Sequence, residues 1–459
     1  MEPNATPQSV LFPDLFDRPV TATFDLPNSS SDGGAVLLKA ADRELGLMDH
    51  LPRCLVERRQ PGKIRHDLQE MLSQRVFGLA CGYADTNDVA RLKSDPIHRL
   101  LVGIDPQRED LLASQPTLSR FENAVGPREL HGLGYALAEL VIDRHRRRLG
   151  KSCRRVALDL DVTDDPTHGD QQFSFFNGFY DSHCYLPLLG FLRFDNEADQ
   201  YLCAAVLRPG NAPTQRGTLG LLRRLLPLLR HAFPKARILV RLDGGFACPE
   251  LFNFLDKEPR VDYAVAMAKN PRLLRLSGPS MKALRSCTRR SKTSARLYGA
   301  GEYKARRWSR PRRVVFKAEI LHREDKEPKE NPRFVVTNLK SSPQFVYEKV
   351  YCYRGEIENR IKELHHGLEI DRTSCSQFWA NQFRVLLTAA AYVLLQEIRL
   401  AAAGTSLARA QVNTLRDHLL KVGALVTCSV RRIVLRLPQS FAFFQEWMRV
   451  ATALRAEAG

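Results

Sequence analysis

A strict two-residue alternation near the middle of the chain is the strongest constraint on its fold. In RRVALDLDVT, which starts at residue 154, every second residue from Val156 to Val162 is apolar. From residue 159 on, the residues between or just after them are polar: Asp159, Asp161 and Thr163. Only an extended strand sends residues with a period of two to opposite faces. The pattern therefore predicts a β-strand with one apolar and one acidic face.

Further strand and helix signals follow in a defined order. Apolar runs that predict strands are found at residues 184–194, 201–207, 238–242 and 261–269. An amphipathic helix is expected at 218–233, and a second helix, opened by Pro249, at 249–257. The resulting order is strand, strand, strand, helix, strand, helix, strand. This is the order of a ribonuclease H-like core.

A strongly basic stretch interrupts this core. Residues 269–313 contain fifteen Lys or Arg and one acid, Glu302, so the stretch carries +14 of the formal net charge of +18. Strand-like runs follow at 314–320 and 333–339. We therefore expect a basic, β-rich insertion. A charge excess of this size favours a polyanionic partner, and nucleic acid is the most common one.

Helical patterns flank the core on both sides. We predict an α/β protein with a ribonuclease H-like catalytic core, a basic β-rich insertion, and helical N-terminal and C-terminal regions. We expect a mainly helical N-terminal region at 1–125 and the first part of the core at 126–268. The insertion should follow at 269–346, the core helices at 347–400 and the helical C-terminal region at 401–459.

The remaining composition excludes several classes of protein. The ten cysteines include no CxxC pair, which argues against zinc ribbons and redox motifs and predicts reduced core thiols of a cytosolic protein. The N-terminus has no basic segment followed by an apolar run, so no secretory signal is expected. The longest apolar run, Val385 to Leu395, is too short to span a bilayer, and no membrane partner is predicted.

Two aspartates follow or end predicted strands. Asp161 lies on the polar face at the end of a central strand, where a carboxylate can hold a divalent metal ion. Asp159 is on the same face, one pleat away, and could hold the metal in its place. Asp243 follows the buried run 238–242 and precedes two glycines, at the carboxyl end of a strand where α/β sheets bind ligands. The alternatives are solvated acids at an exposed strand end and an aspartate that caps a turn.

A third acid belongs to a helical stripe. If residues 347–367 form one helix with about 100° per residue, four polar residues fall in a stripe roughly 60° wide. They are Tyr351, Arg354, Glu358 and His365. Glu356 and Glu363 fall on the other side. The alternative is a solvated charged helix with fortuitous spacing.

Three carboxylates suit the cleavage of a phosphodiester. In-line displacement at phosphorus benefits from two divalent metal ions about 3.5–4 Å apart. Mg²⁺ prefers a few carboxylates together with water and phosphate oxygens. Arg354 could donate two parallel hydrogen bonds to one phosphate, and Tyr351 could donate a hydrogen bond to another phosphate. The pattern predicts metal-dependent phosphoryl transfer by Asp161, Asp243 and Glu358.

These motifs resemble those of DDE transposases of bacterial insertion sequences. More narrowly, the chain resembles the family numbered thirteen-eighty, within the group with the signature Y-(2)-R-(3)-E-(6)-K. The resemblance covers about residues 75 to 395. Its segments are GYADTNDVARLKSDP, LASQPTLSRFEN, LDLDVTDDPTHG with FFNGFYDSHCYLPLLGF, RLDGGF, YRGEIENRIKELHHGLEIDRTSC and FWANQFRVLL.

The resemblance assigns roles to individual residues. The two aspartates of the family fall on Asp161, in preference to Asp159, and on Asp243. The Tyr, Arg and Glu of the signature fall on Tyr351, Arg354 and Glu358. His365 stands where the signature has lysine. A neutral imidazole is a poorer phosphate clamp than an ammonium group, and Lys362 or His366 could compensate.

The resemblance also implies a function. It implies a transposase that cuts DNA at insertion-sequence ends and joins them to target DNA, with two Mg²⁺ ions that Mn²⁺ can replace. The implied partners are double-stranded DNA, gripped in part by the N-terminal helices, and a second copy in a homodimer. The implied location is the bacterial cytoplasm. A nuclease that does not join DNA and a non-catalytic DNA-binding protein derived from a transposase stay open as alternatives.

One aromatic residue lies among the cations of the insertion. Trp308 is found in RRWSRPRR, and relatives in this group carry a β-rich insertion at the same place. An aromatic ring among cations can stack on an extruded base. It can equally be a core tryptophan with a cation–π neighbour.

Overall fold

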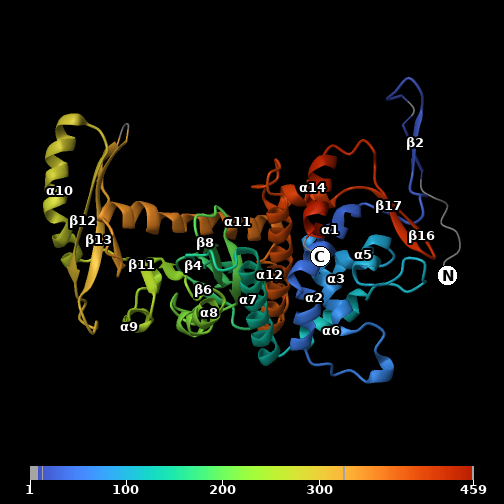
Figure 1. Cartoon of the computed structure of the whole chain (residues 1–459), viewed down its shortest axis with the longest axis horizontal. Helices are drawn as coiled ribbons and strands as arrows, with labels where there is room; N and C mark the ends of the chain where they lie inside the picture. The colour runs from blue at the N-terminus through green and yellow to red at the C-terminus, as the bar shows by residue number, and fades with distance from the viewer. Residues whose placement is uncertain (1–8, 13, 324–325, 457–459) are drawn as a thin grey trace.

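One mixed sheet runs through the chain, and the other elements are arranged around it. The computed structural model describes residues 9–12, 14–323 and 326–456. Figure 1 shows an elongated α/β molecule in which the sheet extends from one end, at β12 and β13, to the middle, at β4 and β8. The insertion lies at one end of the long axis, and the N-terminal helices lie at the other.

The central sheet combines parallel and antiparallel strands. Its strands, in spatial order, are β12 (Ala295–Tyr303), β13 (Arg312–Arg323), β15 (Arg333–Thr337), β11 (Val261–Met267), β10 (Arg237–Leu242), β4 (Arg155–Val162), β8 (Leu188–Phe194) and β9 (Tyr201–Val206), with β14 (Lys326–Glu330) paired to β13. β10 is parallel to both β4 and β11, and the other neighbours are antiparallel. With α8 (Thr218–Ala232) after β9 and α9 (Pro249–Lys257) after β10, the predicted order of strands and helices is confirmed.

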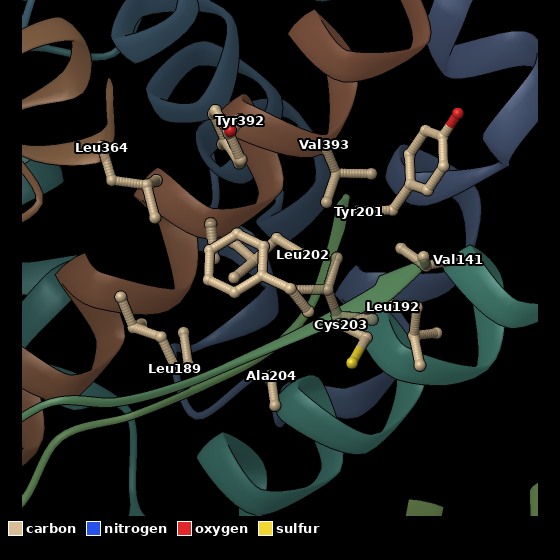
Figure 2. Packing of buried hydrophobic residues seen from close by; sticks show 14 of the residues in the cluster. Val141, Leu189, Leu192, Tyr201, Leu202, Cys203, Ala204, Leu364, Tyr392 and Val393 are labelled. Carbon is tan, nitrogen blue, oxygen red and sulfur yellow. The ribbon is translucent and has the colours of Figure 1, made fainter. Parts of the chain in front are cut away.

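The two faces of β4 enter different hydrophobic clusters. Val156 and the other apolar residues of the alternation join the larger cluster, together with residues of α8 and α9. Figure 2 shows how α7 (Pro127–Leu149) and α12 (Phe378–Ala401) pack on β8 and β9 in this cluster, for instance through Val141 and Tyr392. The opposite face contributes Ala157 to a smaller cluster with the π-helical segment η5 (Phe345–Tyr351). The predicted alternation is confirmed, and η5 covers part of the acidic face.

The insertion begins with a helix rather than a strand. Its first part forms α10 (Pro271–Ser291), whose residues Leu273, Met281 and Leu284 are buried at helical spacing while Arg272, Arg275, Arg285 and Arg289 are exposed. The predicted strands after residue 313 are confirmed as parts of β13 and β15. Because β15 pairs with β11, the insertion extends the central sheet and does not form a separate one.

The N-terminal region is helical from residue 36. Its helices are α1 (Val36–Leu45), α2 (Leu47–His50), α3 (Leu68–Ala80), α4 (Thr86–Arg91), α5 (Pro96–Leu101) and α6 (Gln115–Ala124). The 3-10 turns η1 (Gly33–Ala35), η2 (Leu51–Cys54) and η3 (Pro61–Lys63) separate them. The hairpin β1 (Ser9–Phe12) and β2 (Val20–Thr23) precedes these helices.

The C-terminal region contains both helices and strands. Helices α13 (Val412–Leu415), η7 (Arg416–Leu420) and α14 (Phe444–Ala456) are present. A hairpin of β16 (Ala424–Ser429) and β17 (Arg432–Arg436) lies between them and pairs with β3 (Ser29–Ser30). The region predicted as helical therefore contains this hairpin in addition to its helices. The run ALVTCSVRRIVLR is rich in β-branched residues, which favour strands.

All ten cysteines are free thiols. Cys287 and Cys352 are exposed, so the predicted core position is wrong for these two, and several others are only partly buried. Within the described residues, no helix has the length and apolar character that crossing a membrane would require.

Candidate active site

Adjacent parallel strands bring the two predicted aspartates to the same edge of the sheet. β4 and β10 are parallel, and Asp159 of β4 pairs with Arg241 of β10. Asp161 and Asp243 each lie two residues further along, so they are neighbours at the carboxyl ends of the two strands. Asp243 directly follows β10 and caps the 3-10 turn η4 (Gly244–Phe246), where its carboxylate accepts a hydrogen bond from the Gly245 amide at 2.9 Å. A side chain at Gly245 would lie 2.8 Å from Thr214, so the turn requires glycine.

One arginine contacts both aspartates. Nη2 of Arg354 lies 2.8 Å from Oδ2 of Asp161 and 4.0 Å from Oδ2 of Asp243. Arg354 is nearly buried, and its Nε has no hydrogen-bond partner among the described residues. The structure thus places this arginine against the carboxylates, where the sequence predicted a contact with phosphate.

Arg354 is presented by an irregular helical rod. The segment starts as η5, tightens into the 3-10 turn η6 (Cys352–Gly355) and continues as α11 (Glu356–Leu368). Figure 1 shows this orange rod crossing from the insertion to α12. The single α-helix assumed for the stripe is therefore wrong before residue 356. In a 3-10 turn, side chains three residues apart eclipse, which keeps Tyr351 and Arg354 on one side.

Glu358 lies on α11 beside Asp161. Its side chain is exposed, and it lines, together with Asp161, a pocket of about 420 Å³. Burial raises the pKa of Asp161 to about 6; Arg354 lowers it, whereas Asp243 and Glu358 raise it further. The like charges of three acids therefore act on one another, although they come from residues far apart in the sequence. Tyr351 also lies near Asp161 and Asp243, and burial raises its pKa.

Asp159 occupies a different environment from Asp161. It is fully buried, and its two oxygens accept hydrogen bonds at 2.6 Å from Nε and Nη2 of Arg241. Gln200 donates a further hydrogen bond at 2.5 Å. Asp159 is thus enclosed by protein donors, whereas Asp161 lines the pocket beside Glu358.

His365 is also engaged by protein groups. Its Nε2 lies 3.0 Å from Oγ1 of Thr163, and its Nδ1 lies 2.9 Å from Oδ2 of Asp371. Lys362 and His366 are exposed and line the same pocket as Glu358. The structure therefore leaves these two side chains accessible, whereas His365 is held between a strand end and a loop.

Trp308 is a core residue. Its side chain is 5% exposed and packs edge-on against Phe252 and Tyr303, with the guanidinium of Arg312 5.0 Å from the ring centroid. The base-stacking alternative is contradicted, because an extruded base could not reach a ring enclosed in this way. The cation–π alternative fits.

Sequence reasoning missed several pocket residues. Thr163, Asp164 and Asp371 line the pocket with the predicted acids. A signal for Arg241 was present, since an arginine inside the buried run ILVRL requires a buried acid as its partner. The contacts of Thr163 and Asp371 depend on partners distant in sequence, and no local pattern marks them.

A second group of potential metal ligands lies elsewhere. In the described part of the chain, the donor atoms of Asp32, Cys81 and His98 all lie within 4.8 Å of one another, a spacing that the three predicted acids do not reach. However, Asp32 is hydrogen-bonded by His98 and by the ammonium group of Lys421, each at 2.7 Å. A cation already neutralises this acid, so the group is better described as a buried ion-pair network.

Comparisons with known proteins bear on this geometry. The model of a family described as transposase DDE domain group 1 matches residues 12–458. No curated protein matches the chain. A cryo-EM structure of the piggyBac transposase synaptic complex with hairpin DNA is 9% identical; the alignment covers 93% of this chain and 81% of that chain, with a TM-score of 0.39.

Proposed function

Because the chain belongs to the transposase DDE domain group 1 family, we propose that it cuts DNA at the ends of an insertion sequence and joins those ends to target DNA. The observation that carries this proposal is the meeting of Asp161 and Asp243 at one arginine, Arg354, on the rod that also carries Glu358. Two strand ends and a helical rod from three distant segments thereby meet, and two of the three acids, Asp161 and Glu358, line one pocket.

The sheet supports a ribonuclease H-like core for this site. The strand order β9, β8, β4, β10, β11 has one strand, β8, that runs against the other four. The carboxyl ends of β4 and β10, where ligands bind in such sheets, carry the two aspartates. Asp161 is the first acid of the site, since Asp159 is committed to Arg241.

The acids present fit a divalent metal site. Asp161, Asp243 and Glu358 offer oxygen atoms alone, which Mg²⁺ and Mn²⁺ prefer. Burial raises the pKa of Asp161, and repulsion from the other two acids adds to this effect. The proposed ligands of two such ions are these three residues. When bound, the ions supply activation of the attacking oxygen and stabilisation of the leaving oxygen.

Cations around the acids would hold the DNA backbone. Arg354 lies within the acidic site, and Lys362 projects into the pocket one helical turn after Glu358. We assign Lys362 to a phosphate near the cleaved bond, since its ammonium group is accessible. Tyr351 is placed to donate a hydrogen bond to a phosphate oxygen.

Two further basic surfaces extend the proposed DNA contact. The outward face of α10 exposes Arg272, Arg275 and Lys282 at the end of the molecule. In the N-terminal region, a cleft of about 510 Å³ is lined by the loop before α3 and by α6, and its exposed cations include Lys63, Arg65, Lys93 and Arg120. Both surfaces suit phosphates remote from the cleaved bond, and a homodimer would bring two DNA ends together.

A cleavage assay tests the proposal. The wild-type chain should cut duplex DNA that contains the element's end when Mg²⁺ or Mn²⁺ is added, and should then yield strand-transfer products. Asp243→Asn and Glu358→Gln should lower the cleavage rate about 100-fold or more. Loss of a group that orients a metal ligand already lowers activity by about 10–100-fold, and loss of the ligand itself should lower it at least as much. Glu356→Gln, an exposed substitution on the same helix, should leave the rate unchanged.

The outcomes separate the alternatives. Full cleavage by Asp243→Asn would rule out the site. Cleavage without joined products would indicate a nuclease, and DNA binding without metal-dependent cleavage would indicate a non-catalytic DNA-binding protein.

A further inference from the structure

His365 has both ring nitrogens occupied. Asp371 contacts Nδ1, with its Oδ2 2.9 Å away. On the other side of the ring, Nε2 lies 3.0 Å from Oγ1 of Thr163, within hydrogen-bond distance. Neither nitrogen is left to face a phosphate.

Asp371 belongs to a loop that is fixed on the segment after β4. Oγ1 of Thr373 lies 2.8 and 2.9 Å from the two carboxylate oxygens of the fully buried Asp165. The amide of Gln172 donates to the carbonyl of Ser376 at 2.9 Å. His365 is therefore braced on one side by a loop that is itself anchored to residues 163–172.

The contact between Thr163 and His365 connects β4, which carries Asp161, with α11, which carries Glu358. Thr163 is two residues beyond Asp161 at the end of β4, and it is nearly buried. His365 is seven residues beyond Glu358 on α11, which is about two helical turns on the same face. The hydrogen bond between Thr163 and His365 thus joins the strand of one acid to the helix of another.

We propose that His365 is a positioning residue that sets the separation of Glu358 and Asp161, rather than a clamp on phosphate. This role rests on the proposed function, because it matters only if these acids share a metal site. Lys362 provides the matched contrast. It lines the same pocket on the same helix, but forms no ion pair with any residue that the structure describes.

The two roles predict opposite results in two binding measurements on the full chain. Mn²⁺ affinity is measured without DNA, by electron paramagnetic resonance of the free ion. Affinity for duplex DNA is measured by fluorescence anisotropy in metal-free buffer over a range of salt concentrations. His365→Gln and His365→Lys should weaken Mn²⁺ binding by about 10–100-fold, as loss of a group that orients a ligand does. Their DNA affinity and its salt dependence should not change.

Lys362→Gln should do the reverse. Its Mn²⁺ affinity should stay within about twofold, while the slope of log affinity against log salt should fall by about 0.9, as expected for one lost phosphate contact. If His365→Gln alters the salt slope and spares Mn²⁺ binding, His365 is a phosphate clamp and the proposal is overturned. No change in either measurement would overturn it as well.

A second substitution guards against a folding defect. Thr163→Val removes the hydroxyl group from the other end of the contact at nearly constant shape, and should also weaken Mn²⁺ binding about 10-fold. A wild-type chain that binds no Mn²⁺ would overturn the proposed function itself. Wild-type binding with unchanged affinity in the variants would overturn only the role of His365.

Discussion

Two aspartates on β4, two residues apart, each pair with an arginine. We call a pair closed when protein groups surround and bond its polar atoms on all sides, and the two pairs differ in this respect. Asp159 and Arg241 form a forked pair, with two hydrogen bonds of 2.6 Å and with exposed side-chain fractions of 0% and 3%. Arg241 also donates to the carbonyl of Val350. Every oxygen of Asp159 is thus met by protein donors.

The pair of Asp161 and Arg354 is open by comparison. One guanidinium nitrogen contacts one carboxylate oxygen at 2.8 Å, and both side chains retain about a tenth of their exposure. The same nitrogen approaches Asp243, and Nε of Arg354 is buried without a partner among the described residues. Burial raises the pKa of Asp161 despite this arginine.

The difference shows what separates a structural charge from one available for function. In the closed pair, both oxygens of Asp159 and all three guanidinium nitrogens of Arg241 are engaged, and the pair joins β4 to β10. In the open pair, one oxygen of Asp161 accepts from the Val162 amide and the other contacts Arg354, and Asp161 lines the pocket. We infer that the second pair, not the first, exchanges partners when metal ions and DNA bind.

The largest expected effect comes from breaking the closed pair. Asp159→Asn leaves the guanidinium of Arg241 buried and unpaired, which should lower the free energy of unfolding by about 3–5 kcal/mol. Urea unfolding followed by circular dichroism measures this loss. Asp161→Asn is the matched control one pleat away and should cause no such loss. Equal destabilisation by the two substitutions would remove the distinction between the pairs.

The next effect is a dependence of stability on pH that arises from Asp161 of the open pair. The folded-state pKa of Asp161, about 6, is above the ordinary value of 3.8, so the folded protein holds this proton more tightly than the unfolded chain. The stability due to this proton is present below about pH 4 and is lost as pH rises through 6. At pH 7.5, ionisation of Asp161 therefore lowers the free energy of unfolding by about 2–3 kcal/mol relative to the protonated form.

Asp161→Asn removes this cost. With EDTA present, the free energy of unfolding of the variant minus that of the wild type should increase by about 2–3 kcal/mol between pH 4 and pH 7.5. Urea titrations at the two pH values measure the difference, in which other titrating groups cancel. A difference that is flat with pH would show that Asp161 is not held in this environment.

Much of this arrangement could be predicted from the sequence, because local periodicity encodes it. The alternation from Val156 to Val162 gave the strand, and the order of later runs gave the sheet around it. The turn after Asp243 followed from the two glycines. These features depend on residues within a few positions of one another, where the physical rules of strands and turns apply directly.

The side-chain partners could not be predicted in the same way. Whether Asp159 or Asp161 is enclosed depends on Arg241 of a neighbouring strand and on Gln200. The angular stripe assumed about 100° per residue, but η5 and η6 wind differently before α11 begins. Thr163 and His365 meet across about two hundred residues of chain, and no local pattern contains that information.

The smallest predicted effect tests whether Arg354 competes with a metal ion for the open pair. Arg354→Gln removes a cation 2.8 Å from Asp161 and keeps a polar side chain of similar reach. Mn²⁺ should bind this variant about fivefold more tightly in the absence of DNA, corresponding to about 1 kcal/mol for a partly exposed ion pair.

Titration of Mn²⁺ at pH 7.5 measures the gain, and Arg237→Gln is the control, since Arg237 pairs with Asp262 at the opposite edge of the sheet. The same Arg354 variant should bind duplex DNA more weakly, because the released guanidinium is then missing from the phosphate. If Arg354→Gln instead binds Mn²⁺ more weakly, the arginine holds the acids in place for the metal, and the open pair is as structural as the closed one.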